Sequence, residues 1–264
     1  GLVDIMLMSA STCERLSKEG LFEGSPVTPA IRLNDTTDIW SARGGRYKEE
    51  PSRHHRTARV DQAKKHADLG LYSVTFSNQR DIDAENAEAY TAFRADANKN
   101  AMRHFLEVFN PAFDIRLTQG ADIGSFINDN IVRTLAGVME EDYPKFLKLQ
   151  YNGPRSMEEL ASYDPGHLIV GILGGAAGTA RDTFELLHQA HKYGARVALF
   201  GRKIHRAESP IEIVRMMREV VAGNVTPSEA VKAYHGTLQK AGLKPARSID
   251  DDNQVTEKEL KLAA

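Results

Sequence analysis

The regular alternation of strand-like and helical segments constrains the fold of this chain more than any other feature. Short runs of aliphatic and β-branched residues are each followed by a stretch with apolar residues at helical spacing. Parallel neighbours in a sheet need a crossover connection, so this order predicts an α/β fold with a parallel sheet. We expect seven strands, at residues 3–9, 27–35, 71–76, 113–118, 146–151, 167–173 and 196–200, with helices between them that include 83–109 and 123–141.

Chain length and strand count together favour a (β/α)8 TIM barrel. Such barrels commonly have about 250 residues, and this chain has 264. The sequence begins almost directly on a strand at residue 3, so we expect the given chain to lack the first barrel strand. An open doubly wound sheet is the alternative, because it needs no missing strand. We interpret residues 1–225 as the barrel domain and residues 226–264 as a C-terminal helix with a polar tail.

The C-terminal region carries a clear helix-start signal. Thr226 suits the N-cap, Pro227 the first helical position, and Glu229 closes a capping box. Further on, residues 250–252 are three consecutive aspartates. Three consecutive carboxylates do not converge on one metal ion unaided, so we interpret them as a solvated turn.

Charge and cysteine content exclude several classes of function. Lys and Arg number 34 against 36 Asp and Glu, a net charge of −2, which gives no global basic field for nucleic acid or an anionic membrane. Any anion site must therefore be local. The single cysteine, Cys13, cannot form an internal disulfide, and neither a long apolar run nor a signal-peptide pattern is present. These features predict a cytoplasmic protein, and no metal-ligand cluster is visible.

Glycine-rich segments follow each of the last two expected strands. Gly174 and Gly175 follow the strand at 167–173, and Gly201 and Arg202 follow the strand at 196–200. Glycine lets backbone N–H groups approach a ligand closely, and in barrels the loops after the last two strands commonly form a phosphate site. The two segments together predict a binding site for a phosphorylated small molecule.

Lys148 stands inside a strand-like run, FLKLQY, that is otherwise apolar or aromatic at most positions. Leu147 and Leu149 suit the helix-facing side of a barrel strand, so strand alternation directs Lys148 inward. The same alternation turns further polar side chains inward, at Arg32, Asn34, Arg116 and Thr118. A desolvated lysine near other cations is nucleophilic toward carbonyls. The alternative is that Lys148 pairs with a carboxylate such as Asp114 or Asp35 and only fills the barrel.

Several of these segments together resemble the class I, Schiff-base aldolases of the DeoC/LacD superfamily, particularly the archaeal-type fructose-bisphosphate aldolases and their LsrF-like relatives. The resemblance rests on FLKLQYNG (146–153), ILGGAAG (172–178), GARVALFGRKIHRAESP (194–210), LSKEGLFEG (16–24) and IRLNDTT (31–37). It covers most of residues 1–222. The resemblance implies that Lys148 is the Schiff-base lysine and that a substrate phosphate binds at Gly174, Gly175, Gly201 and Arg202.

The chain also departs from the pattern of this family. The family's first strand, which supplies an aspartate, has no counterpart, and its fifth-strand tyrosine is absent from FDIRLTQG (113–120). Asp35 replaces the glycine that usually follows Leu-Asn on the third strand. Lacking the family's tyrosine and aspartate, the chain offers Thr118, Asp35 and Tyr151 as candidates for the proton shuttle.

We therefore expect a class I aldolase that makes or cleaves a C–C bond in a phosphorylated sugar or keto compound. Attack of Lys148 on the carbonyl would form an iminium, and this chemistry requires neither a metal nor another cofactor. We also expect a homo-oligomer. Two alternatives remain open: a related Schiff-base barrel that transfers acyl or ketose groups, and a non-catalytic barrel that binds a phosphorylated metabolite.

Overall fold

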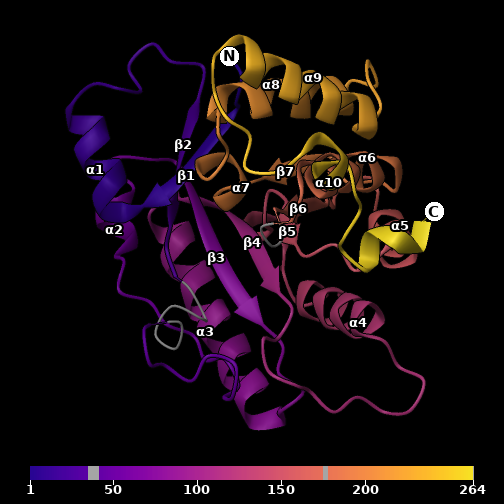
Figure 1. Cartoon of the computed structure of the whole chain (residues 1–264). Coiled ribbons are helices and arrows are strands. Elements are labelled where there is room, and N and C mark those ends of the chain that lie inside the picture. Colours follow the sequence, from indigo (N-terminus) through magenta and orange to yellow (C-terminus); the bar gives the residue numbers. More distant parts are fainter. Residues whose placement is uncertain (35–41, 175–177, 264) are drawn as a thin grey trace. The chain divides into compact units, whose positions relative to one another are not determined.

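The computed structural model describes residues 1–34, 42–174 and 178–263, which form two compact units. The first unit comprises Gly1 and Val3–Leu149, and the second comprises Leu2 and Gln150–Ala264. Each unit contains parallel strands and helices (Figure 1).

The first unit is built on five parallel strands whose order in the sheet follows their order in the chain. The strands are β1 (Ile5–Ser9), β2 (Thr28–Arg32), β3 (Leu69–Thr75), β4 (Arg103–Phe109) and β5 (Leu147–Leu149). The helices are α1 (Ala10–Lys18), α2 (Val60–Ala63), α3 (Arg80–Lys99), α4 (Ile123–Leu135) and the short 3-10 helix η1 (Glu140–Asp142). Strand β3 is buried along its whole length, as expected for an inner strand of a covered parallel sheet.

Aromatic packing shows which face of this sheet is covered by α3. The Tyr72 ring of β3 stacks on Phe93 of α3 with centroids 4.3 Å apart. On the neighbouring strand, His104 Nε2 lies 2.9 Å from the hydroxyl of Tyr90, also on α3. Side chains alternate along a strand, so Ser73 and Glu107 project from the opposite face.

One predicted strand was wrong. The helix expected over 83–109 ends at Lys99, and Arg103–Phe109 forms β4 instead. Residues 113–118 have no regular secondary structure, so the predicted strand there does not form. Asn100 is the C-cap of α3. The next residue, Ala101, has a φ of 50°, in the left-handed region, and so does not continue the helix.

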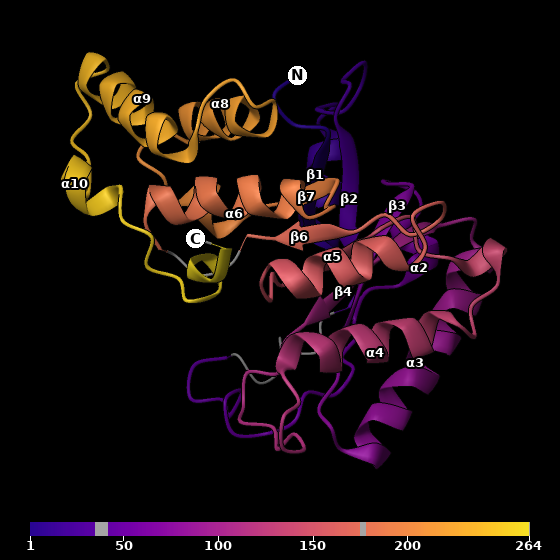
Figure 2. The same cartoon turned by 90° about the vertical axis from the view of Figure 1, so that its right-hand side faces the viewer.

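The second unit contains two parallel strands, β6 (Gly171–Leu173) and β7 (Val197–Leu199). Its helices are α5 (Pro154–Tyr163), α6 (Ala180–Lys192), α7 (Arg202–His205), α8 (Pro210–Val221), α9 (Pro227–Lys240), α10 (Ile249–Asp252) and the 3-10 helix η2 (Glu259–Ala263). Helices α6, α8 and α9 pack on one another (Figure 2). The predicted capping box is confirmed, since Thr226 and Glu229 exchange hydrogen bonds at the start of α9.

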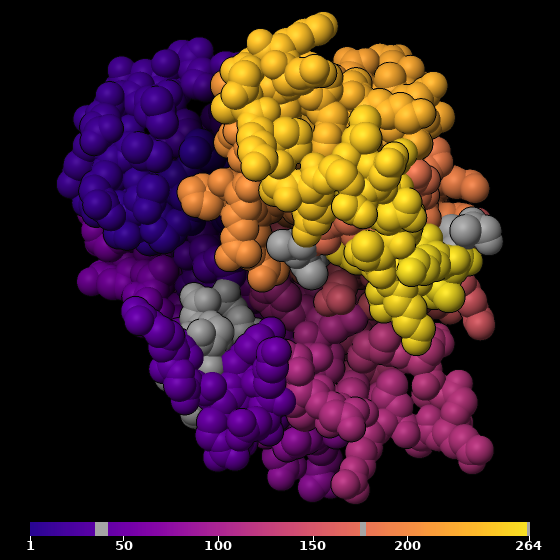
Figure 3. Space-filling view, in the orientation of Figure 1, coloured from indigo at the N-terminus to yellow at the C-terminus, as the bar shows by residue number. Residues whose placement is uncertain are grey.

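The residues after α9 lie on the surface of the second unit (Figure 3) and are attached to it by specific bonds. The solvated turn predicted at 250–252 is wrong for Asp252, which is 7% exposed. Its carboxylate accepts hydrogen bonds from the backbone N–H of Ala180 at 2.8 Å and lies 2.9 Å from His235 Nε2. A buried carboxylate needs such partners, which a solvated turn would not have supplied.

The α/β class and the count of seven strands among the described residues agree with the prediction. The described residues contain no eighth strand, so a closed eight-stranded barrel remains an expectation. Among the same residues, no helix has the length and apolar character needed to span a bilayer.

Candidate active site

A row of polar side chains crosses three neighbouring strands of the first unit. Ser73 of β3 is in register with Glu107 of β4, and Glu107 is in register with Lys148 of β5. Lys148 Nζ donates directly to Glu107 Oε1, and Ser73 Oγ donates to Glu107 Oε2 at 2.9 Å. Arg32, the last residue of β2, places a guanidinium nitrogen 3.7 Å from Glu107 Oε2. The Glu107 carboxylate is therefore the centre of the cluster.

This cluster is almost completely withdrawn from water. Glu107 is 1% exposed and Lys148 is 7% exposed. Burying an unpaired carboxylate is very costly, and the ammonium, the guanidinium and the hydroxyl together supply the partners that the buried Glu107 side chain needs. Arg32 keeps 32% of its side chain exposed, so the cluster reaches solvent on that side.

Asn34 extends the pairing of β2 with β3 beyond the last residue of β2. Its side-chain amide donates to the carbonyl of Ser73 at 2.9 Å, and its Oδ1 accepts from the N–H of Ser73 at 2.5 Å. The amide thus imitates a backbone peptide group, since it offers the same donor and acceptor. This contact fixes Ser73, and Ser73 in turn fixes the Glu107 carboxylate.

Sequence reasoning missed Glu107 because the predicted helix over 83–109 includes it. A signal was present in the alternation of this run, RHFLEVF, in which Phe105 and Glu107 share one face and Leu106 and Val108 the other. Phe105 stacks on Phe146 with ring centroids 4.4 Å apart, so the two strands pack side by side on the face that carries Glu107 and Lys148.

Two candidate residues, Arg116 and Thr118, have different surroundings from those that the strand prediction implied. Arg116 and Thr118 are exposed in the irregular segment after β4, where the carbonyl of Arg116 accepts from Asn78 at 2.6 Å. Neither takes part in the hydrogen bonds and ion pairs that surround Glu107. Asp35 lies outside the described residues.

Tyr151, in the second unit, is buried, and its hydroxyl donates to Gln189 Oε1 of α6 at 2.9 Å. Burial raises the pKa of the Tyr151 hydroxyl above its ordinary value. The hydroxyl is thus already engaged and resists losing its proton, which disfavours a role as a proton carrier.

The glycine loops of the second unit differ in how closely they are packed. A Cβ at Gly174 would lie 2.7 Å from Cδ1 of Phe200, so packing alone requires glycine there. A Cβ at Gly201 would meet no atom within 4 Å, which leaves its backbone open to a ligand. Arg202 is exposed at the start of α7, and Gly175 lies outside the described residues.

Lys203, the second residue of α7, joins the segments that follow the two strands of this unit. Its ammonium donates to the carbonyls of Gly178 at 2.6 Å and Thr179 at 2.7 Å. Burial lowers the pKa of Lys203, with nearby carboxylates acting in the opposite direction. Sequence reasoning did not single out Lys203. In the described part of the chain, no three His, Cys, Asp or Glu side chains are arranged to hold a metal ion.

Comparison with known proteins gives a likeness in structure and none in sequence. No family model matches the chain, and the search of curated proteins found no match. An archaeal fructose 1,6-bisphosphate aldolase superposes with a TM-score of 0.61 at 16% identity, over 83% of this chain and 79% of that one. The chain therefore shares its α/β fold with this aldolase.

Two further structures support the same fold assignment. A Schiff-base-forming fructose-1,6-bisphosphate aldolase has a TM-score of 0.60 at 16% identity, over 81% of this chain and 77% of that one. A protein of Corynebacterium glutamicum (Brevibacterium flavum) has a TM-score of 0.59 at 18% identity, over 84% of this chain and 72% of that one. At such low identities, the likeness shows only that this chain shares the α/β fold of these proteins.

Proposed function

We propose that this protein is a class I aldolase in which Lys148 forms a Schiff base with a phosphorylated sugar or keto compound. The observation that carries the proposal is the direct contact between the buried Lys148 amine and the buried Glu107 carboxylate. The contact lies on the sheet face opposite to α3, in a chain with the fold of fructose-bisphosphate aldolases. A lysine and a carboxylate in contact are the pair that imine chemistry needs, because one attacks and the other carries protons.

Glu107 is our candidate for the proton carrier at each step. It would take a proton from the Lys148 ammonium, and the free amine would then attack the substrate carbonyl. Return of that proton to the carbinolamine oxygen releases water and leaves an iminium. Glu107, again a carboxylate, would then take the proton of the substrate hydroxyl next to the C–C bond; the bond cleaves with its electron pair moving toward the iminium nitrogen, which gives an enamine and an aldehyde and leaves Glu107 protonated. Protonation of the enamine carbon and addition of water then release the second product and restore the lysine.

Arg32 and Ser73 would position the proton carrier. The guanidinium of Arg32, at 3.7 Å, and the hydroxyl of Ser73, at 2.9 Å, both act on the Oε2 atom of Glu107. Lys148 contacts the other oxygen, Oε1. Ser73 and Arg32 thus fix Oε2, while Oε1 faces the amine. This arrangement suits repeated proton exchange between the carboxylate and one nitrogen.

The phosphate of the substrate would bind at the loops that follow the two strands of the second unit. Gly201 supports this role because the space where a Cβ would lie is empty, and Arg202 next to it is exposed. In barrels of this type these loops commonly bind phosphate. Fructose 1,6-bisphosphate, the substrate named for two proteins with this fold, is therefore the first compound to test.

A non-catalytic, metabolite-binding barrel is the second candidate. The contact between Lys148 and Glu107 favours the charged form of the lysine, and an ammonium does not attack carbonyls. If the pair never exchanges its proton, the cluster only fills the sheet face. Transfer of an acyl or ketose group through the same lysine is a further variant of the first proposal.

Reduction by borohydride in the presence of substrate tests the proposal, because it converts an iminium into a stable amine. We expect fructose 1,6-bisphosphate, or one member of a panel of sugar phosphates, to add mass to the peptide that contains Lys148. The adduct should be lost in Lys148→Met and kept in Lys145→Met, which alters an exposed lysine three positions earlier. An adduct on another lysine, or full aldol cleavage by Lys148→Met, would refute the proposal.

A further inference from the structure

Asn34 holds the backbone of the strand that carries a hydrogen-bond partner of Glu107. Strand β3 directs peptide groups toward β2, where the N–H of Leu33 donates to the carbonyl of Leu71 at 2.9 Å. At Ser73 the side-chain amide of Asn34 takes the place of a neighbouring backbone. Its Nδ2 lies 2.9 Å from the carbonyl oxygen, and its Oδ1 lies 2.5 Å from the N–H nitrogen. The amide therefore fixes β3 at this residue.

Ser73 passes its position on to Glu107. It is fully buried, it is in register with Glu107, and its Oγ donates to Glu107 Oε2 at 2.9 Å. A serine hydroxyl is attached directly to Cβ, so a shift of the backbone moves the hydroxyl by a similar distance. A hydrogen bond weakens steeply when its angle departs from the favoured range. The orientation of the carboxylate thus depends on where the Ser73 backbone is held.

The charge of Arg32 does not fix this orientation by itself. Its guanidinium lies 3.7 Å from Oε2 of Glu107, outside hydrogen-bond distance. Coulombic attraction depends on the distance between charges and hardly on direction, so it draws the carboxylate closer without setting its rotation. Among the described contacts of Oε2, the bond from Ser73 is the directional one.

The side chain of Asn34 is engaged by the protein itself. Asn34 is 4% exposed, and both its Oδ1 and its Nδ2 are bonded to Ser73. An amide that bound the hydroxyl groups of a substrate would have to give up these bonds. The arrangement therefore favours support of the sheet over contact with substrate.

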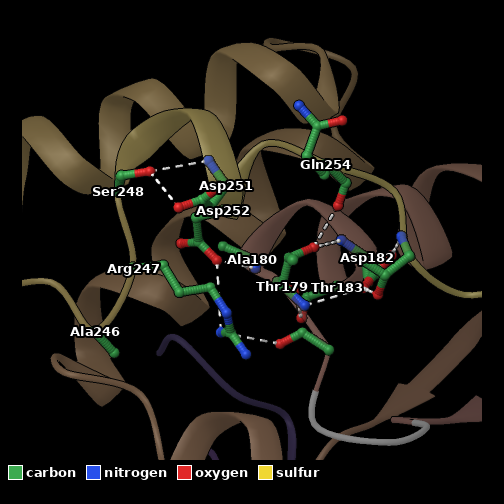
Figure 4. A network of polar contacts seen from close by, with 12 residues as sticks. Thr179, Ala180, Asp182, Thr183, Ala246, Arg247, Ser248, Asp251, Asp252 and Gln254 are labelled. Atoms are coloured by element: carbon green, nitrogen blue, oxygen red, sulfur yellow. Dashed lines mark hydrogen bonds and ion pairs between the residues drawn. The ribbon is translucent and has the colours of Figure 1, made fainter.

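A buried polar network of the second unit shows the contrast, because it fastens one segment to another (Figure 4). Asp252 accepts from the N–H of Ala180 at 2.8 Å. The hydroxyl of Thr179 donates to the carbonyl of Gln254 at 2.7 Å, so the C-terminal segment is tied to the start of α6. The described bonds of Asn34 lead instead, through one serine, to the candidate catalytic pair.

We propose that Asn34 is a positioning residue, which sets the rate of proton exchange between Glu107 and Lys148 by fixing the backbone of Ser73. The inference rests on the proposed function and deepens it, because it assigns Asn34 to turnover and not to substrate binding. Displacement of the proton carrier alone lowers kcat and leaves KM unchanged, whereas loss of a substrate contact raises KM.

Asn86 of α3 provides a matched control in the same unit. It is also 4% exposed, its Nδ2 donates to the carbonyl of Ser52 at 3.1 Å, and its Oδ1 accepts from the N–H of His54 at 2.8 Å. Asn86→Ala and Asn34→Ala each remove an amide that bridges a backbone N–H and a carbonyl. Both variants should therefore unfold at lower urea concentration than the parent.

Steady-state cleavage of fructose 1,6-bisphosphate, or of the sugar phosphate that traps on Lys148, separates the two variants. We expect Asn34→Ala to lower kcat about 10-fold with KM within about twofold of the parent, the effect of one hydrogen bond to a charged group. Asn86→Ala should keep both constants. Ser73→Ala should reproduce the loss, and the double variant should lose no more than Ser73→Ala alone, because the serine hydroxyl is the link. Asn34→Asp keeps the acceptor and gives up the donor, so it should also lower kcat even if Asn34→Ala does not fold.

A second readout needs no substrate. Formaldehyde with cyanoborohydride methylates free amines, and mass spectrometry of the peptides gives the rate at each lysine. Asn34→Ala should speed the methylation of Lys148 by about threefold or more, because a displaced Glu107 no longer favours the ammonium. Lys145, which is exposed, should be methylated at the parent rate, and Asn86→Ala should leave both rates unchanged.

A rise in KM at unchanged kcat would make Asn34 a substrate contact and overturn the inference. Equal losses of kcat in Asn34→Ala and Asn86→Ala would overturn it as well, as would a double variant whose loss is the product of the single losses. If no sugar phosphate is cleaved or trapped, the proposed function fails, and methylation then decides the inference alone. A parent-like rate at Lys148 in Asn34→Ala overturns it, and a faster rate supports it.

Discussion

The buried His104 of β4 should make the first unit sensitive to mild acid. Burial, aided by the positive charges of Arg94 and Lys145 and opposed by Asp142, lowers the pKa of the imidazole from 6.5 to about 4. The neutral ring lies 2.9 Å from the hydroxyl of Tyr90 and packs edge-on against Phe93. Protonation would place an unpaired charge among these rings.

The sign of the effect follows from proton binding in the two states. Below about pH 6.5 the unfolded chain takes up a proton at this histidine, whereas the folded chain does so only near pH 4. Acid therefore favours the unfolded state, and stability falls as the pH is lowered through this window. Each unit of difference between the pKa values of the folded and unfolded states corresponds to about 1.4 kcal/mol of unfolding free energy. Between pH 7 and pH 5 the loss from this one group is about 2 kcal/mol, and its limit at lower pH is about 3 kcal/mol.

Urea unfolding followed by far-ultraviolet circular dichroism at the two pH values measures this loss. His104→Gln keeps a polar side chain beside Tyr90 without a titrating group, so we expect it to lose about 2 kcal/mol less than the parent on acidification. His54→Gln, at an exposed histidine, should behave like the parent. The same pH dependence in His104→Gln and in the parent would show that the buried imidazole does not control acid stability.

Three further predictions concern the sites described above. Glu107→Gln should lower kcat for aldol cleavage by about 100-fold or more, because it removes the proposed proton carrier; turnover within twofold of the parent would exclude that role. Gly201→Ala should leave urea unfolding unchanged, because its φ is −114° and a Cβ has open space, but it should raise KM for phosphorylated substrates only; an equal rise for a dephosphorylated analogue would refute phosphate contact. Asp252→Ala should destabilise the protein by about 3 kcal/mol, because buried His235 and the N–H of Ala180 lose their acceptor; a change within about 0.5 kcal/mol would support the solvated turn.

Local features of this protein were predictable from the sequence. The start of α9 was predicted because a capping box links Thr226 and Glu229, residues close enough in the chain to meet in any helix that begins there. That Lys148 lies on the sheet face opposite to Leu147 and Leu149 followed from the sequence, since alternation is a property of any strand. The α/β class likewise follows from the order of short-range patterns along the chain.

Only the tertiary structure decided which segments pair and which side chains meet. Residues 103–109 and 113–118 both have strand-like alternation, yet only the first forms a strand, because it pairs with β3 on one side and β5 on the other. The partner of Lys148 is Glu107, 41 positions away in the chain. The aspartate of α10 that looked solvated is buried against α6, 72 positions away. Burial and pairing depend on neighbours that are distant in sequence, so no local sequence pattern predicts them. The contact with Glu107 is what makes Lys148 part of a candidate catalytic pair.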